Sequence, residues 1–250
     1  MGAVSRMVVS DTDAATKLAV AEIFTNTIQG EGPSAGMPAT FLRLSGCNLA
    51  CAWCDTPYTW DWTGKNGKIY DIANEVSMMS QNDVRRALEA CSTPLLVITG
   101  GEPILQDKAL YGLLRDSLGM FQRTEIETNG TKIPCFPSDW VSQYNVSPKL
   151  STSGNGPERE NPEAIAWYRN SGRAIFKFVV TESWRRDFEE IDQFVMRHRI
   201  PEDRVWIMPE GRTAIEIADA LPTLVSPVVQ RGYKLTSRLH ILLWGDVRGR

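Results

Sequence analysis

The sequence lacks a long hydrophobic run and an excess of positive charge. No stretch approaches the roughly 18 consecutive apolar residues that a membrane helix needs, and residues 1–17 lack the apolar core of a secretory signal. Lys and Arg number 27 against 30 Asp and Glu, so there is no basic field to bind nucleic acid. We therefore expect a cytoplasmic protein that acts on a small molecule. A single domain over residues 18–250 would follow a disordered tail, residues 1–17.

Five cysteines are present, and three of them lie close together in the sequence. Cys47, Cys51 and Cys54 are separated by three residues and then two. In a reducing compartment such a trio is more typical of metal or redox chemistry than of disulfides. Cys91 and Cys135 are far from the trio and are expected to be buried small apolar side chains.

Histidine is scarce, which weakens the case for zinc. A structural zinc site is closed by four ligands, but His198 and His240 are the only histidines and neither lies in a ligand-spaced motif. A [4Fe–4S] cluster held by three thiolates leaves one iron open to another ligand. We therefore expect a [4Fe–4S] cluster on the three clustered cysteines, with zinc as the alternative.

Apolar runs alternate with turn signals, which predicts repeated βα units. The expected strands cover residues 39–44, 95–99, 124–128, 141–146, 174–180 and 205–208. Helices are expected from about Asn82, from Asp107 to Leu118, from Pro162, and over 187–198. This order predicts an α/β fold in which a parallel sheet with outer helices forms a partial (βα)6 barrel.

Glycine and polar motifs follow four of the expected strands. They are Ser45-Gly46-Cys47, Gly100-Gly101-Glu102-Pro103, Glu127-Thr128-Asn129-Gly130 and Ser147-Pro148-Lys149. The carboxyl ends of parallel strands meet at one edge of the sheet, and active sites gather there in such folds. The sequence therefore predicts one active site on this rim.

The Cys-x3-Cys-x2-Cys spacing resembles the signature of the radical S-adenosylmethionine (radical SAM) enzymes. In that superfamily the open iron chelates the methionine moiety of the cofactor, and an aromatic residue in the position of Trp53 lies near the adenine. Gly100-Gly101-Glu102 is similar to the superfamily's GGE loop. Bare glycines would let the backbone approach the cofactor, and Glu102 would accept a hydrogen bond from its ammonium group.

Other segments, from about Glu22 to the C-terminus, are similar to the 7-carboxy-7-deazaguanine synthases. They include Glu22-Ile23-Phe24, Ile28-Gln29-Gly30-Glu31-Gly32, Phe41-Leu42-Arg43-Leu44, Cys54-Asp55-Thr56 and Leu239-His240-Ile241-Leu242-Leu243-Trp244-Gly245. The resemblance implies a carbon–nitrogen lyase of queuosine-type biosynthesis that converts 6-carboxy-5,6,7,8-tetrahydropterin to 7-carboxy-7-deazaguanine and releases ammonia. It also implies S-adenosylmethionine, Mg²⁺, a homodimer, and an electron donor such as flavodoxin or ferredoxin.

The resemblance assigns site residues by position. The cluster ligands would be Cys47, Cys51 and Cys54. The contacts to S-adenosylmethionine would be Trp53, Cys54, Asp55, Gly101, Glu102, Ser147, Pro148 and Lys149. The substrate contacts would be Ile28, Gln29, Gly30, Arg43 and Thr99, and the Mg²⁺ ligand would be Thr56.

Physical chemistry supports two of these expectations and adds Glu31 to the substrate contacts. The guanidinium group of Arg43 can bind a substrate carboxylate with two parallel hydrogen bonds. An ionised Glu31 only accepts hydrogen bonds, which suits the amino-pyrimidine edge of a pterin. One hydroxyl from Thr56, with substrate oxygens and water, can satisfy Mg²⁺ without a carboxylate cage.

The remaining alternatives concern the type of protein. A radical activating enzyme that acts on a partner protein also carries this cysteine spacing, and a non-catalytic iron–sulfur or zinc protein would need only the cysteines. The Gln29-to-Gly32 loop argues against the first, and Gly100-Gly101-Glu102 would have no role in the second. His240 is expected to be packed rather than to act as a general base. The position of Arg248-Gly249-Arg250 is left open.

Overall fold

Six parallel strands form the centre of the sheet in the computed structural model, which describes residues 17–250. They are β2 (Pro38–Leu44), β4 (Leu95–Gly100), β5 (Arg123–Thr128), β6 (Gln143–Val146), β7 (Ala174–Val180) and β8 (Val205–Pro209). Each pairs in parallel with the next in this order. The six predicted strands and the mostly parallel α/β fold are confirmed.

Three further strands extend the sheet at its edges. β1 (Lys17–Ile28) pairs antiparallel with β2, β3 (Ser77–Ser80) pairs antiparallel with β1, and β9 (Lys234–Leu235) runs parallel to β8. The sequence did not indicate these strands. The tail predicted for residues 1–17 lies outside the described residues except at Lys17, where the prediction is wrong because Lys17 is the first residue of β1.

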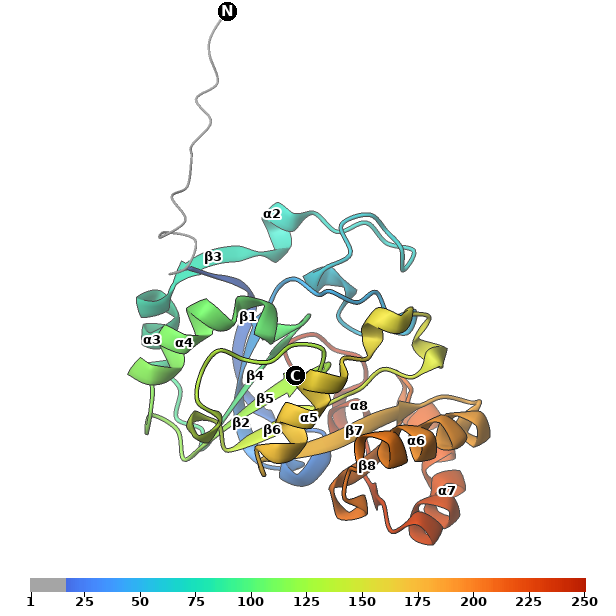
Figure 1. The fold of residues 1–250 in the computed structure, drawn as a ribbon. Coiled ribbons are helices and arrows are strands. Elements are labelled where there is room, and N and C mark those ends of the chain that lie inside the picture. The colour runs from blue at the N-terminus through green and yellow to red at the C-terminus, as the bar shows by residue number, and fades with distance from the viewer. Residues whose placement is uncertain (1–16) are drawn as a thin grey trace, which may run out of the picture.

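Helices pack against the sheet along its length (Figure 1). The four predicted helices are confirmed as α3 (Gln81–Glu89), α4 (Asp107–Asp116), α5 (Pro162–Asn170) and α6 (Trp184–His198). Capping residues determine where two of these helices begin. The Ser80 side chain accepts the backbone N–H of Asp83 in α3, and Asn161 caps α5 directly before Pro162.

The long helix α7 (Ala214–Arg231) was not predicted. It contains Pro222 and Pro227, and proline in a helix interior costs about 3 kcal/mol, so the sequence argued against it. A capping box formed by Thr213 and Glu216 starts the helix, and a buried apolar face holds it on the sheet. Two short helices, α2 (Ile72–Glu75) and α8 (Leu239–Trp244), complete the set in the described part of the chain.

Side chains on the parallel strands alternate between two environments. Tyr144, Phe176 and Phe178 are fully buried in the apolar core that includes residues of the helices. Their neighbours in the strands face the other side and include the polar residues Asn145 and Lys177, which line a cavity. The fold therefore places the main apolar core on one face of the sheet and the cavity on the other, while a second, smaller apolar cluster forms around Phe41 and Val97.

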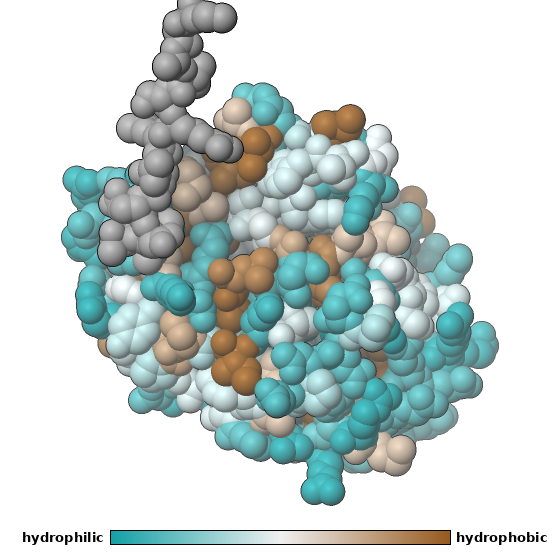
Figure 2. Space-filling model, turned by 45° about the horizontal axis from the view of Figure 1, so that its top comes forward, coloured by the Kyte–Doolittle hydropathy of each residue, from teal (hydrophilic) through white to brown (hydrophobic). Residues whose placement is uncertain are grey.

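The surface is mostly hydrophilic. Figure 2 shows one face on which hydrophilic residues predominate and hydrophobic residues form small clusters among them. None of the helices in residues 17–250 is both long and apolar enough to span a membrane. The five cysteines are free, and the expectation that two of them are buried is wrong: Cys91 is half-buried and Cys135 is exposed.

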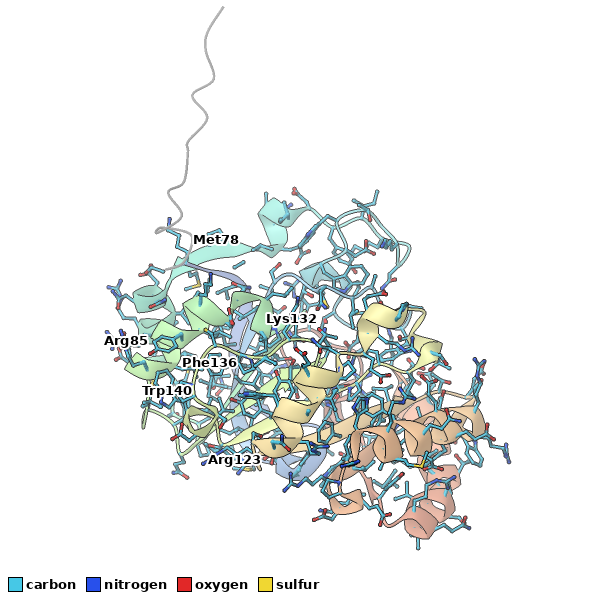
Figure 3. The ribbon with its side chains drawn as sticks, viewed as in Figure 1. Met78, Arg85, Arg123, Lys132, Phe136 and Trp140 are labelled. Atoms are coloured by element: carbon cyan, nitrogen blue, oxygen red, sulfur yellow. The ribbon has the colours of Figure 1, made fainter. Side chains whose placement is uncertain are left out.

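The direction of the strands determines at which end of the sheet the loops after β2, β4, β5 and β6 lie. Arg123 begins β5, and Lys132 follows its end. In Figure 3 Arg123 lies at the lower left and Lys132 lies well above it. The carboxyl ends of the strands, and the loops that follow them, therefore lie towards the upper part of this view.

Candidate active site

A cavity of about 560 Å³ opens at the carboxyl ends of the parallel strands. The loops after β2, β4, β5 and β6 reach it with Cys47, Gly101, Asn129 and Ser147. These loops carry the four motifs that the sequence placed on one rim. The predicted convergence on a single site is thus seen in the fold.

All but two of the predicted site residues line this cavity. Those that do are Ile28, Gln29, Gly30, Glu31, Arg43, Cys47, Cys51, Trp53, Cys54, Asp55, Thr56, Thr99, Gly101, Ser147 and Lys149. The exceptions are Glu102 and Pro148, which lie outside the lining. Segments more than a hundred residues apart in the sequence therefore meet around one space.

Glu102 lies beneath the cavity, not in it. Its side chain is fully buried, and its carboxylate accepts hydrogen bonds from the backbone N–H of Ile104 at 3.0 Å, the Thr128 hydroxyl at 2.8 Å and the backbone N–H of Asn129 at 2.6 Å. Burial raises the pKa of Glu102. The expected contact between Glu102 and a cofactor ammonium group is therefore not supported, and Glu102 instead joins the loops after β4 and β5.

The two glycines before Glu102 let the end of β4 lie directly against the cysteine loop. Gly100 has a φ of +142°, and a Cβ on it would overlap the backbone of Leu44. A Cβ on Gly101 would overlap the carbonyl oxygen of Gly46 and lie 3.0 Å from the Cβ of Cys47. Glycine is thus required here by contact between two protein loops.

We expect Gly101→Ala to displace the cysteine loop. The added methyl group meets backbone at Gly46, which cannot rotate away, so stability should fall by about 1–3 kcal/mol and iron uptake should fall with it. Iron content after anaerobic reconstitution and the thermal midpoint are the measurements. Gly119→Ala is the control for iron uptake: nothing lies within 4 Å of a Cβ at that position, so its cost comes only from its φ of +79°, about 1–2 kcal/mol, and iron uptake should stay normal. Normal iron uptake by Gly101→Ala would contradict the inference that glycine is required here for contact between the two loops.

Each of the three clustered cysteines accepts one N–H group in the cavity wall. Cys47 Sγ accepts the backbone N–H of Leu49 at 3.5 Å, Cys51 Sγ accepts the side chain of Asn155 at 3.1 Å, and Cys54 Sγ accepts the indole of Trp60 at 3.3 Å. Burial raises the pKa of Cys47 to about 12 and also raises that of Cys54. The donors face the sulfurs as they would face thiolates bound to metal.

The cysteines do not form a site for a single ion. No three His, Cys, Asp or Glu side chains among residues 17–250 are grouped so that they could hold one metal ion. A zinc ion needs its ligands to converge on one point. In a [4Fe–4S] cluster each cysteine binds a different iron, so three thiolates on one wall, each with an N–H donor, fit the cluster better than zinc.

Comparison with known proteins identifies the family. A model described as a 4Fe-4S single cluster domain matches residues 28–146. A 7-carboxy-7-deazaguanine synthase of Pyrobaculum aerophilum is 36% identical over 238 residues, which cover 95% of this chain and 99% of that one. The synthase of Halobacterium salinarum is 34% identical and covers 92% of this chain. The chain belongs to the 7-carboxy-7-deazaguanine synthase family.

The fold agrees with this assignment. The crystal structure of QueE from Escherichia coli superposes with a TM-score of 0.69 at 26% sequence identity, over 90% of this chain and 95% of that one. The chain is therefore an enzyme, a lyase that forms 7-carboxy-7-deazaguanine, as the sequence motifs indicated.

The wall next to the cysteines of the synthase fits S-adenosylmethionine. The indole N–H of Trp53 is buried and has no hydrogen-bond partner within the described residues. Lys149 lies over the Trp53 ring, 5.5 Å from its centre, and donates to the Ser147 hydroxyl at 2.9 Å. An aromatic ring next to a hydroxyl and an ammonium group can contact an adenosine with a charged tail.

A buried network of charges crosses the cavity of the synthase. Glu31 pairs with Lys177 and, at 3.3 Å, with Arg238, which also pairs with Asp55. Lys177 and Arg238 are only 5% and 6% exposed. Burial alone would raise the pKa of Glu31, but the charges of Lys177 and Arg238 outweigh it and hold the pKa well below its usual range. Glu31 is therefore ionised at neutral pH.

Helix α8 closes one side of the cavity. The backbone N–H of Leu239 donates to the carbonyl of Gly30 at 2.8 Å, and a side chain on Gly30 would overlap His240. His240 lines the cavity 4.0 Å from Glu31 and packs on Gly30, and the expectation that it does not act as a general base stays a prediction. Burial lowers the pKa of His240, which is therefore neutral at pH 7.

The C-terminal residues also reach the cavity. Arg248 pairs with Glu22 and, at 2.6 Å, with Glu75, and its guanidinium lies over the Tyr58 ring, 4.0 Å from its centre. Gly249 and Arg250 line the same space. The position of the chain end, which the sequence left open, is therefore at the mouth of the site.

The motif argument could not find Lys177 and Arg238, whereas Glu127 belongs to the motif Glu127-Thr128-Asn129-Gly130 on the predicted rim. Glu127 accepts hydrogen bonds from Gln29 at 3.2 Å and from Thr99 at 2.8 Å. Lys177 and Arg238 join it as charged residues buried in the cavity wall. A lysine in the middle of the apolar strand β7 is the one local signal, because a buried charge needs a partner.

Proposed function

We propose that the cavity holds the [4Fe–4S] cluster on Cys47, Cys51 and Cys54, with S-adenosylmethionine beside it and the pterin on the opposite side. The observation that carries the proposal is that residues assigned to all three groups line one space. Trp53 and Lys149 line the wall that we propose for S-adenosylmethionine, and the pterin would lie against residues of β1 and β2.

When bound, the reduced cluster and S-adenosylmethionine supply the radical chemistry that rearranges 6-carboxy-5,6,7,8-tetrahydropterin to 7-carboxy-7-deazaguanine. The protein binds the reactants, holds their atoms within reach and keeps water out. No side chain needs to act as a nucleophile. His240 is neutral at pH 7, because burial lowers its pKa, so it can donate or accept one hydrogen bond at the substrate.

Arg43 is the residue that we propose for the substrate carboxylate. Its Nε donates to Glu22 at 3.3 Å, which orients the guanidinium group and leaves the terminal nitrogens directed elsewhere. The group lies 5.6 Å from the centre of the Phe24 ring, which stacks on Phe41. An oriented guanidinium beside flat aromatic rings suits a flat, carboxylated heterocycle.

The polar edge of the pterin is proposed to lie against Gln29, Glu31 and Thr99. Glu127 holds the side chains of Gln29 and Thr99 through the two hydrogen bonds described above. Glu31 is ionised and only accepts hydrogen bonds, and each of its oxygens has a second lone pair. The side chains on this wall can therefore bind the donors of an amino-pyrimidine ring.

Mg²⁺ is proposed to bind at Thr56. Thr56 lines the cavity, and its hydroxyl lies 3.8 Å from Cys54 Sγ. No carboxylate cage surrounds it in the described part of the chain. Mg²⁺ keeps several waters and needs few protein ligands, so one hydroxyl with substrate oxygens is sufficient.

We expect Thr56→Ala to raise the Mg²⁺ concentration for half-maximal activity roughly tenfold or more, because it removes a metal ligand. Iron content should be unchanged. Product formation at increasing Mg²⁺ is the measurement. Thr56→Ser is the matched control, since it keeps the hydroxyl and should restore the response. An identical Mg²⁺ dependence of Thr56→Ala and the native protein would exclude this site.

Three further properties are proposed. An external one-electron donor, such as flavodoxin or ferredoxin, is proposed because reduction starts the reaction. A cytoplasmic location suits five free cysteines. A homodimer is proposed from the family resemblance.

Anaerobic assay of the reconstituted protein tests the proposed function. The mixture contains reductant, S-adenosylmethionine, Mg²⁺ and 6-carboxytetrahydropterin, and the product is followed by mass. We expect 7-carboxy-7-deazaguanine, and we expect Arg43→Gln to raise the substrate concentration needed for half-maximal rate. Cleavage of S-adenosylmethionine without a deazaguanine product would exclude the pterin and favour a radical activating enzyme. A protein that takes up no iron would exclude the cluster.

A further inference from the structure

Two side chains donate N–H groups to cysteine sulfurs without belonging to the cysteine motif. Asn155 donates to Cys51 Sγ at 3.1 Å, and Trp60 donates to Cys54 Sγ at 3.3 Å. The remaining sulfur, that of Cys47, accepts a backbone N–H instead. Two of the three sulfurs therefore accept hydrogen bonds from side chains that can be substituted without changing any of the three cysteines.

The orientation of the Asn155 amide is fixed by its second bond. Its Oδ1 accepts the backbone N–H of Ala50 at 2.8 Å. An amide turned the other way would place two N–H groups face to face. The nitrogen must therefore point to Cys51, where it also reaches the hydroxyl of Ser153 at 3.0 Å.

The loop that carries Asn155 is tied to helix α6. Glu190 of α6 accepts the backbone N–H of Ser151 at 2.9 Å and its hydroxyl at 2.6 Å. Arg159, on the other side of Asn155, pairs with the same carboxylate at 3.2 Å. Asn155 thus approaches Cys51, 104 residues earlier in the sequence, on a loop anchored at both ends.

Trp60 reaches Cys54 from the loop that follows the cysteines. Its backbone N–H donates to the carbonyl of Pro57 at 3.1 Å. The next residue, Asp61, is buried, and its carboxylate accepts the backbone N–H groups of Gly64 and Lys65, each at 2.9 Å. The indole is therefore held by a turn that the sequence builds locally.

Hydrogen bonds to cluster sulfurs have a defined electrostatic effect. Reduction adds a negative charge to the cluster and its thiolates, and an N–H donor stabilises the more negative state more strongly. We propose that Asn155 and Trp60 are positioning residues that raise the reduction potential of the synthase's cluster through Cys51 and Cys54. This inference rests only on the part of the proposed function that places the cluster on the cysteines.

The midpoint potential of the reconstituted cluster tests the inference. It is measured by redox titration followed by electron paramagnetic resonance, without S-adenosylmethionine or pterin. Trp60→Phe keeps an aromatic ring and removes the N–H, so we expect a shift to a more negative potential at unchanged iron content. Asn155→Asp keeps the acceptor for Ala50 but turns an oxygen to the sulfur, so we expect a larger shift in the same direction.

Two matched control variants separate the loss of a hydrogen bond to a cysteine sulfur from the other effects of each substitution on the potential. Trp62→Phe makes the same change in the same loop, outside the cavity lining. Asn66→Asp adds the same charge near the same cysteine, since Asn66 donates to the carbonyl of Cys51 at 3.3 Å and not to its sulfur. We expect no shift for Trp62→Phe and a smaller one for Asn66→Asp than for Asn155→Asp.

The outcomes are decisive in either direction. Negative shifts in Trp60→Phe and Asn155→Asp beyond those of their controls support the inference, and unchanged or more positive potentials overturn it. Should Asn155→Asp fail to take up iron, Trp60→Phe alone decides. The titration needs no substrate, so failure to form a deazaguanine would refute the proposed function and leave this inference intact.

Discussion

Cys51→Ala is expected to abolish both cluster binding and product formation. Cys51 is buried in the cavity wall between the other two cysteines of the motif. Its removal leaves two thiolates for the cluster and leaves the N–H group of Asn155 without its acceptor. Iron and sulfide content, and product measured by mass, should both fall below detection.

Cys91→Ala is the matched control for this change. Cys91 is half-buried at the end of α3, where its sulfur donates to the carbonyl of Ala87 at 3.4 Å, away from the cavity. The control should keep iron and activity. Retention of the cluster absorbance and of product by Cys51→Ala would show that the cysteine motif does not bind the cluster.

Arg238→Met is expected to destabilise the protein more than any other single change at a charged residue of the cavity. Arg238 is 6% exposed, pairs with Glu31 and Asp55, and donates to the carbonyl of Gly211 at 2.6 Å. Methionine fills a similar volume but leaves two carboxylates short of a partner. Breaking a buried ion pair in this way costs on the order of 3–5 kcal/mol.

The destabilisation by Arg238→Met should depend on pH with a defined sign. In the native protein the pKa values of Glu31 and Asp55 are lowered, so their contribution to stability is present above the unfolded pKa values of about 4 and is lost as the pH falls through the folded values. Without Arg238 the two pKa values rise. The stability difference between native protein and variant should therefore be largest near pH 7 and narrow on acidification.

Urea unfolding at a series of pH values measures this difference. Arg115→Met is the control, because Arg115 pairs with Asp116 on the surface and should contribute little at any pH. A difference that widens on acidification would contradict the assigned charges. Product formation by Arg238→Met should also fall, because Arg238 connects the substrate loop at Glu31 with the cofactor side at Asp55.

The central strands and the cysteine site were predictable because each has a strong local signal. The strand from Ala174 to Val180, for example, is a nearly continuous apolar run, and it is found at those residues. The cysteine spacing and the loop at Gly100 are read from a few adjacent residues. Convergence of these loops then follows from the geometry of parallel strands.

The remaining features depend on tertiary contacts that leave little trace in the sequence. β1 is broken by register shifts and contains Asn26 at a φ of 62°, so its pattern is irregular. Helix α7 persists despite Pro222 and Pro227 because its buried face packs on the sheet. Arg238 reaches Glu31 from 207 residues further along the chain, and no local pattern predicts such a pair.

The most direct test of this account is a crystal structure of the anaerobically reconstituted protein with S-adenosylmethionine and 6-carboxytetrahydropterin bound. We expect iron on Cys47, Cys51 and Cys54, and the pterin in the same cavity with its carboxylate on Arg43. A cluster held by other residues, or a pterin bound outside this cavity, would contradict the central claim that one site at the strand ends holds the cluster, the cofactor and the substrate together.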